Sequence, residues 1–262
     1  MARPPLPCYH PRMTEADTRR HAKTLVVGGT GATGKLLIDQ LLERGGSVRT
    51  IVRARDRLPE HLQDHADVEV IEATLLDLTD EQLAQHVSGC SAIASCLGHN
   101  LSFKGIFGPP WRLVTQAVKR LCAAARAADG DKPVRFVLMG SSGVRNGDLE
   151  EPIPIAQHAV LGLLRVFIQP HRDNETAAKA LRIGVGPDDP AIAWCVVRPD
   201  GLIDEDEVGP YDLVESPTRS AIFDAGQVAR IQVAHAMAEL ITNDDLFATW
   251  RGRMPVLYGR DA

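Results

Sequence analysis

Short apolar runs rich in β-branched residues alternate with longer stretches of helical periodicity along most of the chain. Six such runs predict strands, at residues 23–28, 47–53, 68–73, 91–97, 134–140 and 191–198, and residues 255–258 could add another. Helical patterns cover residues 33–44, 80–87, 111–128, 156–168, 172–183 and 226–242. Strands that are apolar throughout are buried on both faces, as in a parallel sheet covered by helices. We therefore predict an α/β fold with a doubly wound, Rossmann-like parallel sheet.

In such a sheet the binding crevice lies at the carboxyl ends of the strands. The first strand is followed by GGTGATGK, residues 28–35. This segment matches the dinucleotide fingerprint G-x-G-x-x-G from Gly29 and the related spacing G-x-x-G-x-x-G from Gly28. It also matches most of a P-loop, but Leu36 stands where a P-loop needs Ser or Thr to hold Mg²⁺. We predict a dinucleotide cradle formed by Gly28, Thr30, Gly31, Ala32, Thr33 and Gly34.

The end of the second strand indicates which dinucleotide is preferred. An NAD-binding strand usually ends with a carboxylate that accepts from the ribose 2′-hydroxyl. Here no carboxylate occurs from Gly45 to Arg55, whereas Arg53 and Arg55 follow the strand. Guanidinium groups suit a 2′-phosphate. The prediction is NADP(H), and the alternative is a solvated basic loop in an arginine-rich chain.

Composition restricts the class of protein. The 262 residues carry a net charge of −5, which argues against a dedicated nucleic-acid binder. No apolar run reaches the length of a membrane span. The five cysteines form no C-x-x-C pair and fit reduced thiols in a cytoplasmic protein. Residues 1–22, with four prolines and no apolar core segment, predict a flexible arm rather than a secretory signal. Residues 23–262 are expected to form one domain, whose oligomeric state the sequence leaves open.

Taken in order, several segments resemble an atypical branch of the short-chain dehydrogenase/reductase superfamily. This NAD(P)H-binding, NmrA-like branch includes flavin and biliverdin-IXβ reductases. The matching segments are residues 26–34, 77–78, 95–98, 141–142 and 197–201. The resemblance implies that Asp77 and Leu78 lie by the adenine, that Cys96, Leu97 and Gly98 line the ribose, and that Arg198, Pro199 and Gly201 border the nicotinamide. Ser141, after the fifth strand, is also counted among the cofactor contacts.

The superfamily's usual catalytic pair is missing. In relatives a tyrosine acts as general acid and a lysine four residues later lowers its pKa. The chain has three tyrosines, Tyr9, Tyr211 and Tyr258, and none is followed by lysine at that spacing. Ordinary ketone–alcohol chemistry is therefore not expected.

Hydride transfer to a conjugated acceptor such as a flavin, quinone, enone or tetrapyrrole remains open, because the acceptor itself stabilises the charge. We predict an NADPH-dependent reductase of a small molecule, with Ser142 and His171 as polar groups near the nicotinamide. Two alternatives remain: a non-catalytic NADP(H)-binding protein that senses redox state and binds a partner, and a non-redox isomerase or lyase.

Aromatic residues indicate where a flat substrate could bind. Phe103, Phe107 and Trp111 lie on a glycine-rich loop after the fourth strand, and could wall a pocket or simply pack the loop. Residues 203–222, with Tyr211, are expected to form a small substrate cap. The pairs His61-x-x-x-His65 and Cys96-x-x-His99 lack further ligands, so no metal site is predicted. Asp173 is expected to cap the helix in which it lies.

Overall fold

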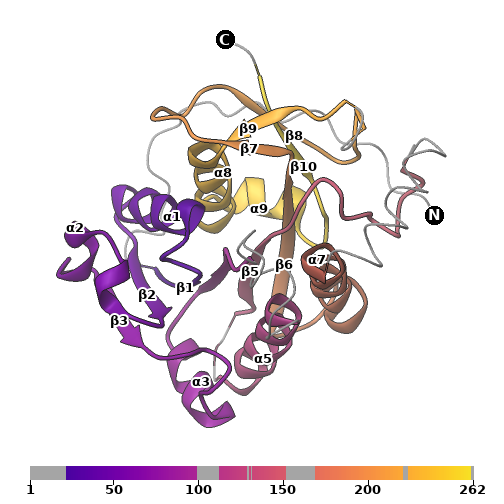
Figure 1. Cartoon of the computed structure of the whole chain (residues 1–262). Helices are drawn as coiled ribbons and strands as arrows, with labels where there is room; N and C mark the ends of the chain where they lie inside the picture. The colour runs from indigo at the N-terminus through magenta and orange to yellow at the C-terminus, as the bar shows by residue number, and fades with distance from the viewer. Residues whose placement is uncertain are drawn as a thin grey trace.

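An eight-stranded sheet forms the centre of the computed structural model, which describes residues 22–98, 112–128, 130, 132–151, 169–220 and 224–260 (Figure 1). Its strand order is β3-β2-β1-β4-β5-β6-β10-β8, and all pairs are parallel except β10 with β8. The bounds are β1 (Lys23–Val27), β2 (Ser47–Val52), β3 (Val68–Glu72), β4 (Ala92–Ser95), β5 (Val134–Met139), β6 (Ile192–Pro199), β8 (Tyr211–Val214) and β10 (Val256–Gly259).

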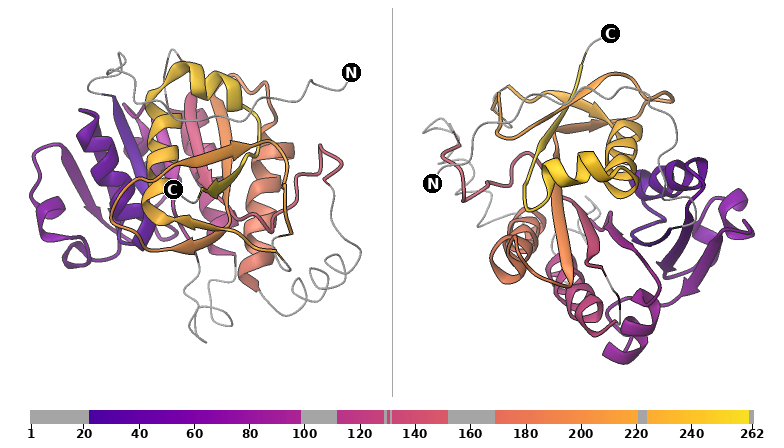
Figure 2. Two further views of the ribbon diagram at one scale, coloured as in Figure 1. Left: turned by 90° about the horizontal axis from the view of Figure 1, so that it is seen from above. Right: turned by 180° about the vertical axis from the view of Figure 1, so that it is seen from behind.

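Helices cover both faces of this sheet (Figures 1 and 2). One face carries α1 (Ala32–Glu43), α8 (Arg230–Thr242) and α9 (Asp244–Trp250), and the other carries α3 (Asp80–Val87), α5 (Leu113–Ala127) and α7 (Gln169–Lys179). Shorter pieces are a 3₁₀ turn at Arg55–Arg57, α2 (Glu60–Gln63) and a π-helical segment, Ala180–Val185, that continues α7. The α/β, doubly wound prediction is confirmed. None of the described helices is both long and apolar enough to cross a membrane.

The side of the sheet on which successive strands are added changes at β1 and β4, which are parallel neighbours. After β1 the chain builds β2 and β3 on one side, and it then crosses to build β4, β5 and β6 on the other. Neighbouring crossover helices therefore separate at the carboxyl ends of β1 and β4, which opens a crevice there. The glycine segment after β1 stands at this crevice.

The carboxyl-terminal third departs from the predicted pattern. Gln227–Ala229 forms β9, which pairs with β7 (Gly201–Ile203) in a separate two-stranded sheet, so the helix predicted from residue 226 begins at Arg230. Within the expected cap over residues 203–222, Tyr211–Val214 forms an edge strand of the main sheet, and the cap itself stays a prediction. The helix predicted at residues 156–168 and all but the last residue of the predicted arm, residues 1–22, lie outside the described residues.

Candidate dinucleotide-binding site

The loop between β1 and α1 is packed so closely that it requires glycine at two positions. Gly28 has φ of +82°, and a Cβ atom there would lie 2.6 Å from the carbonyl carbon of Cys96 on the neighbouring strand end. A Cβ atom at Gly34 would lie 2.1 Å from the Gly28 oxygen. The turn is closed by a hydrogen bond from Gly31 N to Gly28 O of 3.0 Å. Because these glycines have no side chains, the loop backbone packs directly against the end of β4, and at these positions no side chain covers the loop.

The start of α1 presents unpaired backbone donors. Gly31 precedes the helix with no side-chain cap, and the first turn contains no acidic residue. The first intrahelical bond runs from Lys35 N to Gly31 O, so the amides of Ala32, Thr33 and Gly34 have no acceptor within the helix. Gly31 and Ala32 are exposed. These amides and the positive end of the helix dipole fit a pyrophosphate group.

The end of β4 forms the other wall of the crevice. Cys96 N donates to Val27 O at 2.9 Å, which joins this strand end to β1. The Cys96 side chain turns into the core, where its Sγ lies 3.9 Å from Met237 Sδ, and burial raises the pKa of this thiol to about 12. Leu97 is half-buried and Gly98 is exposed. Only the backbone of Cys96 can therefore take part in a ribose contact.

The two arginines after β2 have different surroundings. Arg53 is exposed, and nothing in the described part of the chain bonds to its guanidinium. Arg55 instead donates to Asp64 Oδ1 at 3.0 Å and to the Gln63 carbonyl, so its side chain is tied to α2. The assignment of both arginines to the cofactor stays a prediction, and Arg53 is the stronger candidate because its guanidinium is not tied to another described element.

The loop expected beside the adenine is held by a residue that the sequence does not single out. Asp77 is exposed and Leu78 is half-buried. Arg120, on α5, donates to the carbonyls of Leu75 at 3.2 Å, Leu76 at 2.9 Å and Leu78, and bonds to Asp80. An arginine in an amphipathic helix gives no sequence signal for this role, because it is indistinguishable from a solvated one.

Three chain segments meet beyond β5 and β6. Ser142 Oγ donates to Asp200 Oδ1 at 3.0 Å, and Ser142 N donates to Pro199 O at 2.8 Å. Gly226 N donates to Asp200 Oδ2 at 2.7 Å. The buried Asp200 carboxylate thus fixes the candidate hydroxyl and the start of the two-stranded sheet. Asp200 follows Arg198-Pro199 in the sequence, and it was missed because an acidic residue at a strand end usually faces water.

His171, on α7, lies against the same loop. A Cβ atom at Gly143 would be 3.4 Å from His171 Cε1 and 3.8 Å from Ser141 Oγ, so the loop and the imidazole are neighbours. His171 Nε2 lies 3.5 Å from Glu175 Oε1 and makes no hydrogen bond within the described structure. The two candidate catalytic residues, Ser142 and His171, are therefore both placed at the carboxyl end of β5.

The Arg198 side chain is enclosed by protein. It is completely buried, and its guanidinium donates to Met254 O at 2.6 Å, Val144 O at 2.8 Å and Glu151 Oε1 at 2.7 Å. Burial lowers the pKa of Arg198, and the charge of Glu151 opposes that shift. The expected nicotinamide contact is wrong for this side chain, because every direction from the guanidinium is filled by protein. Gly201 is exposed, and its expected contact with the nicotinamide stays a prediction.

Tyr211 is also a core residue. It is completely buried in β8, and its hydroxyl lies 2.8 Å from His235 Nδ1. The expected contact of Tyr211 with substrate is therefore wrong. Phe103, Phe107 and Trp111 lie outside the described residues, so the aromatic wall stays a prediction.

Asp173 caps a helix, but not the one in which it lies. Its buried carboxylate accepts from the backbone amides of Val114 at 2.8 Å and Thr115 at 3.0 Å, at the start of α5. The sequence-based expectation was wrong because α7 begins at Gln169, which places Asp173 inside the helix. Of the proposed His pair, His61 Nε2 bonds to Asp39 Oδ1 at 2.8 Å.

Known proteins resemble this chain over most of its length. An uncharacterized chloroplastic protein of Arabidopsis thaliana is 27% identical over 244 residues, which cover 88% of this chain and 83% of that protein. ChuY, an anaerobilin reductase from Escherichia coli O157:H7, is 19% identical, with a TM-score of 0.64 over 92% of this chain and 98% of that chain. The oxidoreductase ylbE from Lactococcus lactis is also 19% identical, with a TM-score of 0.64 over 92% of each chain. These two structures share the fold.

A family model described as NAD(P)H-binding matches residues 28–244, from the glycine at the end of β1 to the start of α9. The match includes the cradle, both walls of the crevice and the joined ends of β5 and β6. This chain belongs to the NAD(P)H-binding family.

Proposed function

We propose that the chain binds NADP(H), with the pyrophosphate at the start of α1 and the 2′-phosphate at Arg53. The supporting observation is the bare glycine cradle, whose three amides lack helix acceptors next to a strand that ends in an exposed arginine. Glutamate or aspartate at the end of β2 would favour the 2′-hydroxyl of NAD(H), and neither occurs there.

The experiment compares NADPH and NADH binding by fluorescence titration in Arg53→Gln and Arg55→Gln. A charge-assisted contact contributes about 1.5–3 kcal/mol, which corresponds to roughly 10–150-fold in affinity. Arg53→Gln should weaken NADPH binding by about that factor and leave NADH binding unchanged. Arg55→Gln removes the same charge two residues away, from a side chain already paired with Asp64, and should leave the preference unchanged. Equal NADPH and NADH affinity in the wild-type chain would exclude the NADP(H) proposal.

The proposed reaction is reduction of a small conjugated acceptor. The bound cofactor would supply the hydride, and the chain's own residues would orient the reactants and handle the proton. Tyr258 is buried, and burial raises the pKa of its hydroxyl, while Tyr211 is enclosed in the core. Neither described tyrosine therefore serves as a general acid. His171, beside the 141–143 loop, is the proposed proton donor, and Asp200 holds Ser142 in position.

Activity is tested by following NADPH oxidation with quinones, flavins, enones and linear tetrapyrroles. We expect turnover above background with at least one class, reduced by an order of magnitude or more in kcat in His171→Gln at an unchanged NADPH dissociation constant. Unchanged kcat in this variant would remove His171 from the mechanism.

Two observations favour the alternative of a non-catalytic redox sensor. The Ser142 hydroxyl is already engaged by Asp200, and the usual Tyr-Lys pair is missing. A sensor would bind NADP⁺ and NADPH tightly and turn over none of the acceptor classes. Substrate-dependent NADPH oxidation excludes it.

A further inference from the structure

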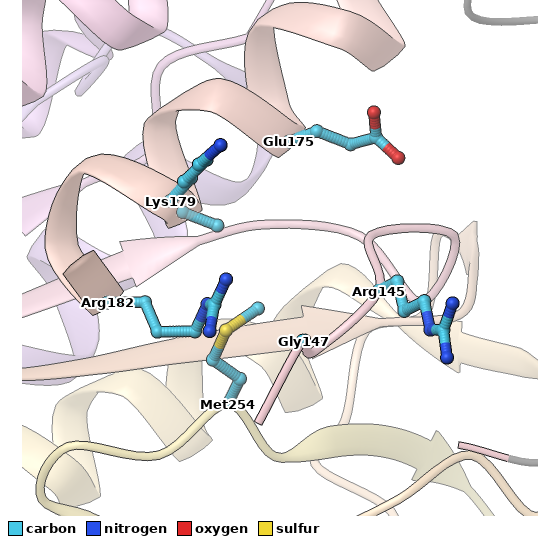
Figure 3. Close-up of a pocket in the computed structure, with 7 residues that line it drawn as sticks. Arg145, Gly147, Glu175, Lys179, Arg182 and Met254 are labelled. Carbon is cyan, nitrogen blue, oxygen red and sulfur yellow. The ribbon is translucent and has the colours of Figure 1, made fainter. Parts of the chain in front are cut away.

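A second cavity lies away from the crevice between β1 and β4. It occupies about 340 Å³ between α7 with the π-helical segment that continues it, the loop after β5, and Met254 shortly before β10 (Figure 3). Its walls come from the part of the molecule around β5, β6 and β10, whereas the crevice lies between β1 and β4. Its volume lies in the range of sites for small organic ligands. Its lining residues are Arg145, Gly147, Glu175, Ala178, Lys179, Arg182 and Met254.

The charge of this cavity is opposite to that of the chain as a whole. Three cationic side chains, Arg145, Lys179 and Arg182, line it with a single carboxylate, that of Glu175, in a protein of net charge −5. Arg145 and Lys179 are exposed, and the described residues give them no hydrogen-bond or ion-pair partner. The Glu175 carboxylate lies 3.5 Å from His171 Nε2.

Arg182 is held in a fixed orientation at the cavity wall. Its guanidinium is paired with Asp148, and a Cβ atom at Gly147 would lie 2.8 Å from Nη2, so the group rests against glycine backbone. Arg182 belongs to the π-helical segment Ala180–Val185. Such widened turns are rare and occur often at functional sites, because they change the direction of one side chain. Ala178 and Met254, both almost fully buried, add an apolar floor.

We propose that this cavity binds the carboxylate or phosphate group of a small organic molecule. Arginine and lysine donors recognise both anions, and a fixed guanidinium favours a planar or tetrahedral oxyanion over a simple halide. The apolar floor accommodates the carbon skeleton next to the anionic group. Glu175, which lines the cavity, lies 3.5 Å from His171, so the cavity is next to that residue. Binding of an anion in this cavity does not require a nucleotide in the β1–β4 crevice.

The experiment maps amide chemical shifts of the ¹⁵N-labelled full-length chain during titration with benzoate, phenyl phosphate and inorganic phosphate. Each titration is made without nucleotide and with saturating NADP⁺. We expect saturable shifts at residues 145–147 and 175–182 with at least one probe in both conditions. Saturation with only benzoate identifies carboxylate as the preferred anion, saturation with only the two phosphates identifies phosphate, and saturation with all three shows that the cavity accepts both. The absence of saturable shifts at these residues with every probe overturns the proposal.

Two double variants that remove the same total charge distinguish binding in the cavity from nonspecific attraction of the anionic probes to the protein. Arg145→Gln/Lys179→Gln should weaken probe binding at least tenfold, because both substituted side chains line the cavity. Lys119→Gln/Arg251→Gln removes two exposed positive charges elsewhere and should change the affinity less than twofold. Equal weakening in the two variants contradicts the proposal. Failure of NADP⁺ to bind would refute the proposed function and leave the probe titrations interpretable.

Discussion

Replacing Glu151 with glutamine should destabilise the protein strongly, although it changes only one atom type and no volume. Glu151 and Arg198 are an ion pair with side chains 1% and 0% exposed, at 2.7 Å. The second Glu151 oxygen accepts from Asn146 N at 2.9 Å. Removing one partner of a buried pair typically costs about 3–5 kcal/mol, because the remaining charge stays buried without compensation. We expect a value near the lower end, since glutamine keeps one oxygen acceptor.

Urea unfolding measures this difference. With a slope of about 3 kcal/mol/M for a domain of this size, the midpoint should fall by roughly 1 M at unchanged slope. The matched control is Asp204→Asn, which breaks an ion pair between Arg230 and an aspartate that is 84% exposed. That variant should lose less than about 1 kcal/mol. A loss in Glu151→Gln as small as in the control would refute the argument.

The same pair of measurements distinguishes the two roles considered for Arg198. A cofactor contact would make Arg198→Met weaken NADPH binding in a protein of normal stability. A buried clamp predicts the reverse order, with a loss of stability at least as large as that of Glu151→Gln, because the carbonyls of Met254 and Val144 also lose their donor. Urea unfolding and NADPH titration on the same preparation provide both values.

Three further outcomes are expected. Gly28→Ala should abolish nucleotide binding in a fluorescence titration. It should also lower the free energy of unfolding more than Gly45→Ala does, because both glycines have positive φ but only Gly28 lies against another strand. Equal losses of stability in the two variants would contradict the close packing at Gly28. Burial lowers the pKa of His235, whose Nδ1 lies 2.8 Å from the Tyr211 hydroxyl. The contribution of His235 to stability is therefore present above the unfolded-state pKa of about 6.5 and is lost as the pH falls below that value. In His235→Gln, the free energy of unfolding should depend less on pH below about 6.5. Cys96, with a pKa of about 12, should resist iodoacetamide at pH 8 in native protein, as measured by mass spectrometry, and labelling as fast as in urea would exclude its burial.

The sequence predicts the parallel sheet well because each strand is an apolar run of four or more residues between clear helical patterns. It misses β7, β8 and β9, whose three or four residues are too short for a periodic signal. The glycine cradle was predictable because its spacing reflects local geometry.

The roles of Arg198 and Asp173 were not predictable, because each depends on a partner far away in the chain. Glu151 is 47 residues from Arg198, and Val114 is 59 residues from Asp173. A buried arginine and a ligand-binding arginine have the same local sequence, and only the three-dimensional packing distinguishes them. Arg53 and Arg55 illustrate the same point at short range. Their local sequences are alike, but only Arg55 bonds to residues at the end of α2.

The position of β10 has a consequence for synthesis on the ribosome. This strand is the last described element, yet it lies inside the sheet between β6 and β8, and Met254 just before it accepts from Arg198. The amino-terminal strands and the glycine cradle can assemble as they emerge, since domains tend to fold from the amino terminus during translation. The edge of β6 and the loop after β5 stay incomplete until residues 254–259 leave the exit tunnel. A nascent chain stalled before that point would expose the edge of an apolar strand, β6.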